Sequence, residues 1–294
     1  MNDDRQFQRV GLVAKGTSEE AGEAAREVAE WLERRGLEAV LSPRQVAPGG
    51  TPPFGGDRNF DLVVVLGGDG TLLATARALP RIPILGGNLG TLGFLTEVSR
   101  SELYPSLVEV LEGRFEIEER ALLDAEHVTP DGRRSGFRIL NDAVITKGAL
   151  ARIIELTVRV DGHLVARFRS DGVIISSPTG STAYNLSAGG PIVVPQLPVV
   201  VVTPICPHTL TLRPVVIPAS SRVEVTLETS REEVFLTLDG QEGEELAGGD
   251  VVAVELSREV VHLVKVSGRT FYDSLRGKLR WGGGVAGVEP PTKT

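Results

Sequence analysis

The chain has 294 residues, of which 41% are hydrophobic, so it can bury a core larger than that of one small domain. Its net charge of -8 does not favour nucleic acid as a partner, because phosphate backbones are bound by clustered Lys and Arg side chains. Cys206 is the single cysteine and cannot form an intramolecular disulfide, and the polar N-terminus and short apolar runs predict neither a signal region nor a membrane span. We therefore expect a cytoplasmic protein without a membrane or nucleic-acid partner.

Residues 1–118 alternate short apolar runs with helical patterns. Ser18 is a suitable N-cap, with Glu19 and Glu20 in the first helical turn, and the apolar run 62–66 is typical of a strand buried on both faces. The predicted strands span 9–14, 37–41, 62–66 and 82–85, and the predicted helices follow Ser18 and span 72–79. This alternation predicts an α/β N-terminal domain with a Rossmann-like open sheet.

Strand signals dominate from Ile117 to Val266. Alternation is clear in 223–227, and the turn pair Asp161-Gly162 is typical of a hairpin. Strands are predicted at 139–145, 153–160, 163–169, 172–176, 199–203, 222–227, 234–238 and 251–255. We expect residues 119–267 to form an all-β, sandwich-like domain that binds the substrate. A C-terminal helix over 271–281 is expected to return to the N-terminal domain, so that residues 268–294 complete residues 1–118.

The segment Gly67 to Thr71 (Gly-Gly-Asp-Gly-Thr) lies between a predicted buried strand and a predicted helix. Glycines let the backbone turn tightly and approach a ligand, and the free N–H groups at a helix start favour phosphate. Asp69 would repel an anion, so a carboxylate in this loop is useful as a base for a hydroxyl or as a metal anchor. The plainer alternative is a corner in which Asp69 caps the helix.

Two further segments interrupt apolar runs. Residues 86–95 form a second glycine-rich loop, in which Phe94 either stacks on a flat ring or lies in the core. Asn141 and Asp142 are adjacent polar residues, and within a strand one of them would face a core and need polar partners such as ribose hydroxyls. A turn at the end of a strand is the alternative for this pair.

Residues 176–191 are the densest small-polar stretch of the chain and follow Arg169 to Gly172. Hydroxyl groups and exposed amides on a Gly-Pro scaffold suit a sugar or carboxamide ligand. A plain solvated loop is the alternative, but Tyr184 and Leu186 would be unusual there.

The familiar metal and nucleotide motifs are not found. Cys206 and His208 lack a second pair at ligand spacing, so no protein ligand for a metal is predicted. The sequence contains neither a Walker-type phosphate loop nor a Gly-x-Gly-x-x-Gly fingerprint, so any nucleotide is held by another device.

Taken in chain order, these motifs resemble the NAD kinase family. The resemblance runs from about Val10 to Trp281. The shared patterns are Gly-Gly-Asp-Gly-Thr, Leu-Gly-x-Leu-Gly-Phe-Leu, the Asn-acid pair, Asp-Gly followed by Pro-Thr-Gly-Ser-Thr-Ala-Tyr, Ile-Cys-Pro-His-Thr-Leu with Arg-Pro after it, and Asp239-Gly240-Gln241. Gly-Gly-Asp-Gly alone also occurs in diacylglycerol-type lipid kinases and phosphofructokinases, whereas the Pro-Thr-Gly-Ser-Thr-Ala-Tyr stretch is specific.

The resemblance implies transfer of the terminal phosphoryl group of ATP, or of polyphosphate, to the 2′-hydroxyl of the adenosine ribose of NAD, giving NADP. Asp69 would be the catalytic base that takes the hydroxyl proton. The implied substrate-binding residues are Gly70 and Phe94 near the adenosine, Asn141 and Asp142 at ribose or adenine, Arg152 and Arg169 near the product phosphate, Asp171, Thr182, Ala183, Tyr184, Asn185, Leu186 and Ser187 at the nicotinamide end, and Thr179 and Gln241 as further positions.

The same resemblance implies a divalent metal ion, Mg²⁺ above all, that is carried with the phosphate donor. It also implies a homo-oligomer, a dimer or a tetramer, with ligands near subunit interfaces. The chain departs from the family in two places. Most members have Glu where this chain has the shorter Asp142, and some carry a basic residue where it has Ala74, which leaves Arg77 as the candidate cation for the donor phosphates.

The sequence leaves two other functions open. A lipid kinase would share the glycine loop with Asp69, but it needs an apolar slot that the polar Thr-Ala-Tyr-Asn stretch does not favour. A non-catalytic NADP sensor would not need Asp69. Incubation with NAD, ATP and magnesium separates the three functions, because NADP is formed only by an NAD kinase.

Overall fold

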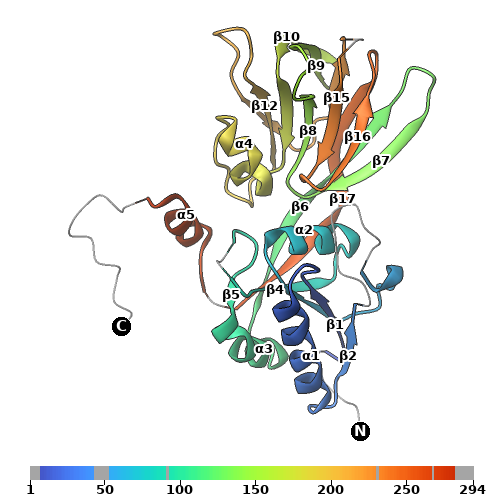
Figure 1. The fold of residues 1–294 in the computed structure, drawn as a ribbon. Helices are drawn as coiled ribbons and strands as arrows, with labels where there is room; N and C mark the ends of the chain where they lie inside the picture. Colours follow the sequence, from blue (N-terminus) through green and yellow to red (C-terminus); the bar gives the residue numbers. More distant parts are fainter. Residues whose placement is uncertain (1–6, 43–52, 91–92, 230–231, 267, 282–294) are drawn as a thin grey trace.

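The computed structural model describes residues 7–42, 53–90, 93–229, 232–266 and 268–281. They form an α/β unit and a β-sandwich stacked end to end, as Figure 1 shows, and long strands run through both. The predicted combination of an α/β N-terminal part and an all-β C-terminal part is confirmed.

The α/β unit is built on a parallel sheet with the strand order β4-β3-β1-β2. Its strands are β1 (Arg9–Ala14), β2 (Glu38–Leu41), β3 (Leu62–Leu66) and β4 (Pro83–Asn88), and the short β5 (Val98–Ser99) pairs with β4. Its helices are α1 (Glu19–Glu33), α2 (Asp69–Ala78) and α3 (Leu103–Leu111), with 3₁₀ turns at Pro53–Gly56 and Arg100–Glu102. The predicted N-cap of α1 is confirmed, because Ser18 accepts a hydrogen bond from the N–H of Ala21 at 3.2 Å.

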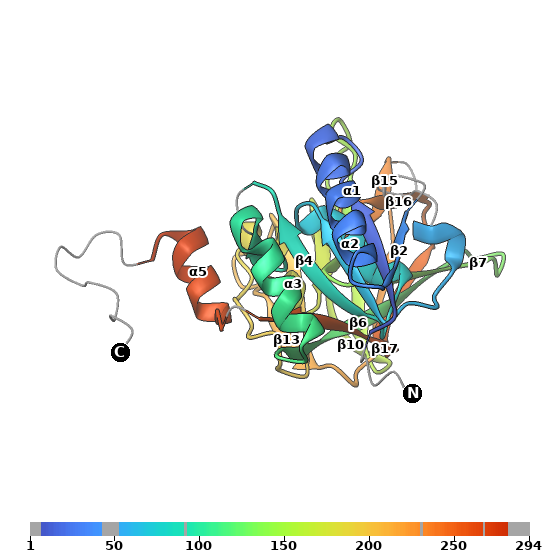
Figure 2. The ribbon, with the colours of Figure 1, turned by 90° about the horizontal axis from the view of Figure 1, so that it is seen from below.

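Helices cover both faces of this sheet. On one face, Val28 of α1 and Leu107 of α3 pack with Leu12 and Val64, and Figure 2 shows these two helices on the same side. On the other face, α2 packs through Leu72 onto Val63, Val65 and Ile84. Burial on both faces is why β3 reads as the continuous apolar run Leu-Val-Val-Val-Leu.

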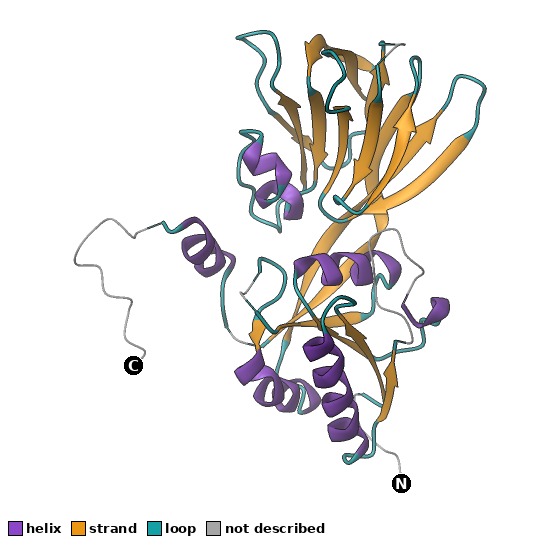
Figure 3. Ribbon diagram, viewed as in Figure 1, coloured by secondary structure: helices purple, strands orange, loops and turns teal. Residues whose placement is uncertain are grey.

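The sandwich consists of two layers of mostly antiparallel strands, drawn in orange at the top of Figure 3. One layer has the order β13-β12-β11-β8-β15-β16, and the other contains β10, β9, β14, β17, β6 and β7. The bounds are β6 (Glu116–Val128), β7 (Arg134–Ile139), β8 (Asp142–Lys147), β9 (Ile154–Val160), β10 (His163–Ser170), β11 (Gly172–Ser176), β12 (Val199–Ile205), β13 (Val215–Pro218), β14 (Val223–Leu227), β15 (Val234–Leu238), β16 (Glu242–Leu246) and β17 (Val251–Lys265), with a 3₁₀ turn at Thr179–Thr182 and α4 at Tyr184–Ser187. Alternate apolar side chains such as Ile145, Val173, Val225 and Leu236 fill the core between the layers.

The long strands β6 and β17 pair antiparallel and join the two units into one eleven-stranded sheet. The first half of β17 pairs with β14 in the sandwich, and near its end His262 and Leu263 pair with β4 of the α/β unit. The sequence predicted a strand only over 251–255, because polar residues at 257–259 interrupt the pattern. A register shift between Leu256 and Val260 accommodates them. The predicted domain boundary at 118/119 falls inside β6.

The C-terminal helix α5 (Phe271–Leu279) begins at Thr270, whose side chain accepts from the N–H of Asp273 at 3.2 Å. Arg269 ties the approach to this helix to the α/β unit, because it donates to the carbonyl of Glu97 at 2.7 Å and pairs with Glu102 at 3.0 Å. The helix itself lies beside the body of the molecule in Figures 1 and 2. The part of the expected segment 268–294 that follows residue 281 lies outside the described residues. Within the described ranges, no helix has the length and apolar character to cross a membrane.

Candidate active site

Asp69 is the first residue of α2, and its carboxylate joins the two glycine-rich loops. Its Oδ2 accepts a hydrogen bond from the N–H of Phe94 at 2.8 Å. Its Oδ1 accepts from the N–H of Leu95 at 3.2 Å and from the N–H and hydroxyl of Thr96, both at 3.1 Å. The alternative in which Asp69 caps its own helix is wrong, because Gly68 is the N-cap and no side chain caps α2.

The second glycine-rich loop folds closely around this carboxylate. A Cβ atom at Gly93 would lie 1.8 Å from Oδ1 of Asp69, so no other residue fits there without moving the loop. Thr96 also accepts from the N–H of Gly93 at 3.1 Å, which closes the loop on itself. The glycine at this position therefore permits the approach of Asp69, and Phe94 is held next to it, half-buried.

Asn141 and Asp142 lie where the chain leaves β7 and enters β8. The continuous strand predicted over 139–145 is wrong at this point, because the backbone turns to present three N–H groups to one buried carboxylate. Asp239 accepts from the N–H of Leu140 at 3.0 Å, of Asn141 at 2.7 Å and of Asp142 at 3.1 Å. The strand-end turn that the sequence left open is the arrangement found.

Burial sets the electrostatics of this turn. It raises the pKa of the Asp142 carboxyl to about 7, and repulsion from Asp239 acts in the same direction. Burial also raises the pKa of Asp239, although the three N–H donors and the nearby Arg77 oppose the shift. Two carboxyl groups are thus held close together in a desolvated corner.

A cavity of about 340 Å³ lies between α4, the outer face of β8 and the turn that joins β15 to β16. Asp142, Val144 and Thr146 line it because alternate residues of β8 face the same side, whereas Ala143 and Ile145 face the sandwich core. The full lining is Asn141, Asp142, Val144, Thr146, Ala183, Tyr184, Thr237, Asp239 and Gly240. Four predicted site residues, Asn141, Asp142, Ala183 and Tyr184, are therefore brought together here.

Gln241 connects this cavity to the first glycine-rich loop. Its amide donates to the carbonyl of Gly70 at 2.7 Å and accepts from Arg77 at 2.9 Å. Arg77 was the candidate cation for the donor phosphates, and the structure corrects this expectation. Its guanidinium is 9% exposed and pairs with Asp239 at 3.4 Å and Glu242 at 3.0 Å, so it is engaged inside the protein.

The polar stretch 176–191 is held by its own side chains. Asn185 is fully buried; its amide donates to the carbonyls of Ser181 at 3.0 Å and Pro191 at 3.1 Å and accepts from Thr203 at 2.6 Å. It therefore fixes the stretch against β12. Around it, Thr179 is buried, Thr182 and Leu186 are half-buried, and Tyr184 and Ser187 are exposed.

Three predicted residues, Arg152, Arg169 and Asp171, lie neither in the cavity lining nor in the glycine-rich loops and polar stretch around it. Asp171 lies 3.8 Å from Lys147, at the opposite end of β8 from Asp142, and five residues of strand span about 16 Å. Arg152 and Arg169 have exposed side chains. Their backbones are engaged, since the N–H of Arg152 donates to Glu232 at 2.8 Å and the carbonyl of Arg169 accepts from the N–H of His208 at 2.9 Å.

Sequence reasoning assigned no role to Thr96 or Thr237, and it quoted Asp239 only as part of a shared motif. Asp239 and Gly240 have φ angles of 51° and 64°, as a tight hairpin turn requires. The Asp-Gly pair between apolar runs was therefore a usable signal for the β15–β16 hairpin, as Asp161-Gly162 was for β9–β10. No local pattern marks Thr96 or Thr237, whose roles depend on contacts between distant segments.

Comparisons with known proteins agree with this arrangement. The family model of the ATP-NAD kinase N-terminal domain matches residues 55–115, and that of the ATP-NAD kinase C-terminal domain matches residues 140–266. An NAD kinase of Geotalea daltonii is 44% identical over 283 residues, which cover 94% of this chain and 99% of that protein. An NAD kinase of Geobacter sulfurreducens is 46% identical over 282 residues, with the same coverage.

Solved structures give the same result. A crystal structure of yeast NADH kinase complexed with NADH is similar with a TM-score of 0.85 and 26% identity, covering 98% of this chain and 91% of that one. A structure of an NAD kinase from Archaeoglobus fulgidus in complex with ATP is similar with a TM-score of 0.74 and 30% identity, covering 93% and 99%. Because both family models match in order and the relatives align over nearly their whole length, the chain belongs to the NAD kinase family.

Proposed function

We propose that Asp69 is the catalytic base in the reaction of this NAD kinase, the ATP-dependent phosphorylation of NAD. It takes the proton from the 2′-hydroxyl of the adenosine ribose while that oxygen attacks the terminal phosphoryl group of ATP. The observation that carries the proposal is the unequal number of hydrogen bonds accepted by the two oxygens of the Asp69 carboxylate. Oδ1 accepts three hydrogen bonds from the second loop, whereas Oδ2 accepts one, from Phe94.

This unevenness leaves Oδ2 with room for a substrate hydroxyl, because a carboxylate oxygen can accept more than one hydrogen bond. The backbone donors hold the group in one orientation, so little rearrangement is needed when substrate binds. A ribose hydroxyl is a poor nucleophile at neutral pH, and a well-placed base contributes roughly 10²–10⁴-fold to the rate. Asp69 is half-buried and accessible from the glycine loops.

The cavity beside α4 is the proposed NAD site. Its polar lining, with Asn141, Asp142 and Thr237, suits ribose and amide groups, and the ring of Tyr184 offers a flat wall. Since the pKa of Asp142 is raised to about 7, this carboxyl can either donate to or accept from a ribose hydroxyl near neutral pH. This lining is too polar for the apolar slot of a lipid kinase, which was the first alternative.

A divalent metal, Mg²⁺ in the first place, is proposed to arrive with the phosphates of ATP. Among the described residues there is no group of three or more His, Cys, Asp or Glu side chains that could hold an ion. Mg²⁺ that is bound through substrate phosphates keeps several waters and does not require a dedicated cluster of protein ligands. When bound, the metal neutralises charge on the phosphoryl group that is transferred.

A homo-oligomer is proposed from the surface of the sandwich. Apolar side chains are exposed near one open edge of the two layers, where Val165 of β10 and Val215 of β13 line the same hollow. Leu164 and Val216 beside them are 59% and 49% exposed. Exposed apolar patches of this kind mark interaction surfaces, and a second copy of the chain is the partner proposed here.

Assay of the purified protein with NAD, ATP and Mg²⁺ tests the function, with NADP as the product measured. Parallel reactions replace ATP by inorganic polyphosphate, or NAD by NADH or diacylglycerol. NADP is expected with ATP, and no phosphorylated lipid is expected. Tight NADP binding with no NADP formation would identify the non-catalytic sensor and contradict the proposal.

A further inference from the structure

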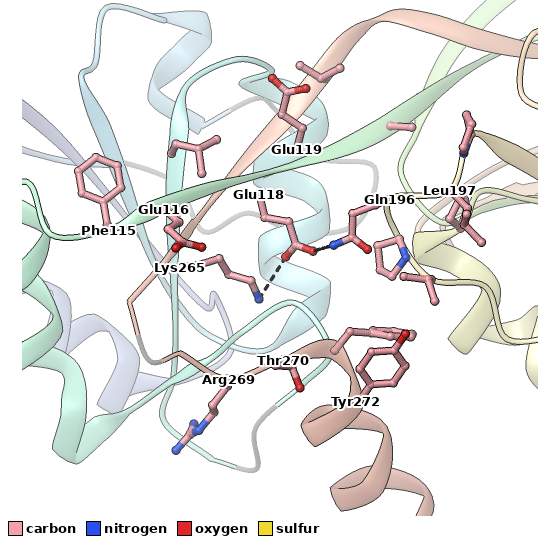
Figure 4. A pocket seen from close by; sticks show the side chains of 18 of the residues that line it. Phe115, Glu116, Glu118, Glu119, Gln196, Leu197, Lys265, Arg269, Thr270 and Tyr272 are labelled. Carbon is pink, nitrogen blue, oxygen red and sulfur yellow. Dashed lines mark hydrogen bonds and ion pairs between the residues drawn. The ribbon is translucent and has the colours of Figure 1, made fainter. Parts of the chain in front are cut away.

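A largely buried cluster of four charged side chains lies where the two units meet, beside a wide groove of about 1260 Å³ between α5, β6 and the loop 194–199. Two of the four, Glu118 and Lys265, line the groove. Figure 4 shows Lys265 and Glu118 at its centre. The ammonium of Lys265 contacts the carboxylate of Glu97 and lies 3.2 Å from that of Glu118. Arg120 lies 3.0 Å from the same oxygen of Glu118, Oε2. The two negative charges of the glutamates therefore balance the two positive charges of Lys265 and Arg120.

Glu97 and Arg120 are buried, and Lys265 and Glu118 are half-buried. Their exposed fractions are 19% for Lys265, 9% for Glu97, 13% for Glu118 and 4% for Arg120. Two buried atoms, Oε2 of Glu97 and Nε of Arg120, have no hydrogen-bond partner in the described part of the chain. Buried ion pairs with incomplete hydrogen bonding are poor stabilisers, and apolar side chains of similar volume are often as good. Stability alone is therefore a weak reason for this cluster.

The cluster connects the two halves of the candidate active site. Glu97 follows directly on Thr96, which donates two hydrogen bonds to Asp69. At the other end, Arg120 donates to the hydroxyl of Thr179 in the polar stretch at 3.5 Å. Lys265, at the end of β17, lies between Glu97 and Glu118.

Other groups hold the same cluster from outside. The amide of Gln196 donates to Glu118 at 2.7 Å, as Figure 4 shows. Arg269 donates to the backbone carbonyl of Glu97 at 2.7 Å. Glu97, which follows the loop around Asp69, is therefore held through both its side chain and its backbone. Glu118 is held from the sandwich side by Gln196.

We propose that Lys265 is a positioning residue of the phosphoryl-transfer reaction. By pairing with Glu97 and Glu118 at once, it fixes the loop that holds Asp69 relative to the polar stretch that borders the NAD site. The inference rests on the proposed role of Asp69 and adds a distant residue through which its placement is controlled. Lys265 itself touches neither substrate nor reacting atoms.

Replacement of Lys265 tests this role through the split between kcat and KM. Lys265→Met alone leaves Glu97 buried without its cation and can fail to fold, so the variant to measure is Lys265→Met combined with Glu97→Gln, which removes both charges. Folding is checked by thermal unfolding. We expect a Tm within about 5 °C of the unchanged protein, a fall in kcat of at least roughly tenfold, and a change in the KM for NAD of less than about threefold.

Arg114→Met is the matched control. Arg114 lines the same groove but forms exposed ion pairs with Glu109 of α3 and with Glu112, the C-cap of that helix, away from the loop. Its replacement is expected to leave kcat within about twofold. Equal losses in the control and the double variant would mean that the groove wall matters in general, and would overturn the proposal.

A pH profile separates positioning from a purely structural role. Burial lowers the pKa of Lys265 to about 8, in spite of the facing carboxylates of Glu97 and Glu118 and with the cations of Arg120 and Arg269 nearby. The kcat of the unchanged enzyme should therefore fall above pH 8. Lys265→Arg keeps its charge at that pH, so it should retain kcat at pH 7 and remove the fall above pH 8.

The outcomes distinguish this inference from the proposed function. A folded double variant with unchanged kcat, or an alkaline fall that Lys265→Arg does not alter, would overturn the positioning role of Lys265 while Asp69→Asn still abolishes turnover. If Asp69→Asn kept full turnover as well, the role of Asp69 itself would fail. A lower Tm with unchanged kcat would show the cluster to be structural only, which contradicts the proposal.

Discussion

Asp69 in the α/β unit and Asp142 in the sandwich are both aspartates at the start of a secondary-structure element, but their surroundings differ. Asp69 accepts four hydrogen bonds from a single loop and remains half-buried. Asp142 is 3% exposed, and none of the described residues donates a hydrogen bond to its carboxylate. Burial and the neighbouring Asp239 raise its pKa to about 7.

The difference indicates a division of labour between the two units. A carboxylate held by backbone donors has a fixed position, which suits a proton acceptor in the reaction. A buried carboxyl without internal partners is costly until a ligand supplies them, which suits recognition of a polar substrate. Under the proposed function, the α/β unit would place the reacting group, and the sandwich would keep polar groups without internal partners for NAD.

The largest expected effect concerns Asp239, which holds the turn beside Asp142. Asp239→Ala removes the acceptor of three backbone N–H groups and one carboxylate partner of the buried Arg77. We expect a loss of about 3 kcal/mol in the free energy of unfolding, measured by urea denaturation. Glu242→Ala is the control, because it removes the more exposed partner of Arg77 and should cost less. Equal losses of unfolding free energy in the two variants would contradict the importance assigned to the buried turn.

The next effect tests the loop around Asp69. Gly93→Ala places a Cβ atom 1.8 Å from Oδ1 of Asp69 and must displace the loop or the carboxylate. We expect kcat to fall about 100-fold, a barrier increase of ~2.7 kcal/mol. Gly90→Ala is the matched control, since its Cβ would lie 3.7 Å from Oδ1 of Asn88, an ordinary van der Waals distance. A fully active Gly93→Ala enzyme would show that the close approach is not needed.

A third prediction uses the raised pKa of Asp142. Between its ordinary pKa of 3.8 and its folded pKa of about 7, the folded state keeps a proton that the unfolded state releases. Stability from this group is therefore lost as the pH rises towards 7. Asp142→Asn should make the ligand-free protein more stable at pH 8, by on the order of 2 kcal/mol, and should show little difference at pH 4. A variant that is less stable at pH 8 would contradict this reading.

The smallest effect lies in the sandwich, away from the site. Burial opposes the charge on His127, but hydrogen bonds to Glu244 and Asp250, both at 2.8 Å, outweigh it and raise its pKa. The charged His127 therefore stabilises the folded state below pH 6.5, and this stabilisation is lost as the pH rises through the folded pKa. His127→Gln should therefore cost about 1 kcal/mol more at pH 6 than at pH 9. A pH-independent difference, measured by denaturation at both pH values, would exclude the charged form.

Local patterns were sufficient for the glycine loops and the buried strands. The run Leu-Val-Val-Val-Leu before Gly67 and the N-cap at Ser18 each carry their structural reason in neighbouring residues. The same is true of the Asp161-Gly162 hairpin, whose two residues adopt φ angles of 50° and 79°.

Features that depend on distant partners could not be read in this way. The break between β7 and β8 follows from Asp239, almost one hundred residues further along the chain. The pairing of Arg77 with Asp239 and Glu242 also depends on residues far along the chain, so the availability of Arg77 for phosphates was misjudged from sequence. Strand β6 was not predicted, because it begins with charged residues such as Glu118 and Arg120. In the structure these side chains have polar partners at the boundary of the two units: Glu118 pairs with Lys265, and Arg120 donates to Thr179.

The central claim, that the α/β unit supplies the base and the sandwich binds NAD, is tested most directly by Asp69→Asn. NAD binding is measured by calorimetry and NADP formation by a coupled assay on the same preparation, in the presence of ATP and Mg²⁺. The account predicts NAD affinity within about threefold of the unchanged enzyme and a loss of roughly 10²–10⁴-fold in kcat. Turnover near the full rate, or loss of NAD binding with kcat unchanged, would contradict it.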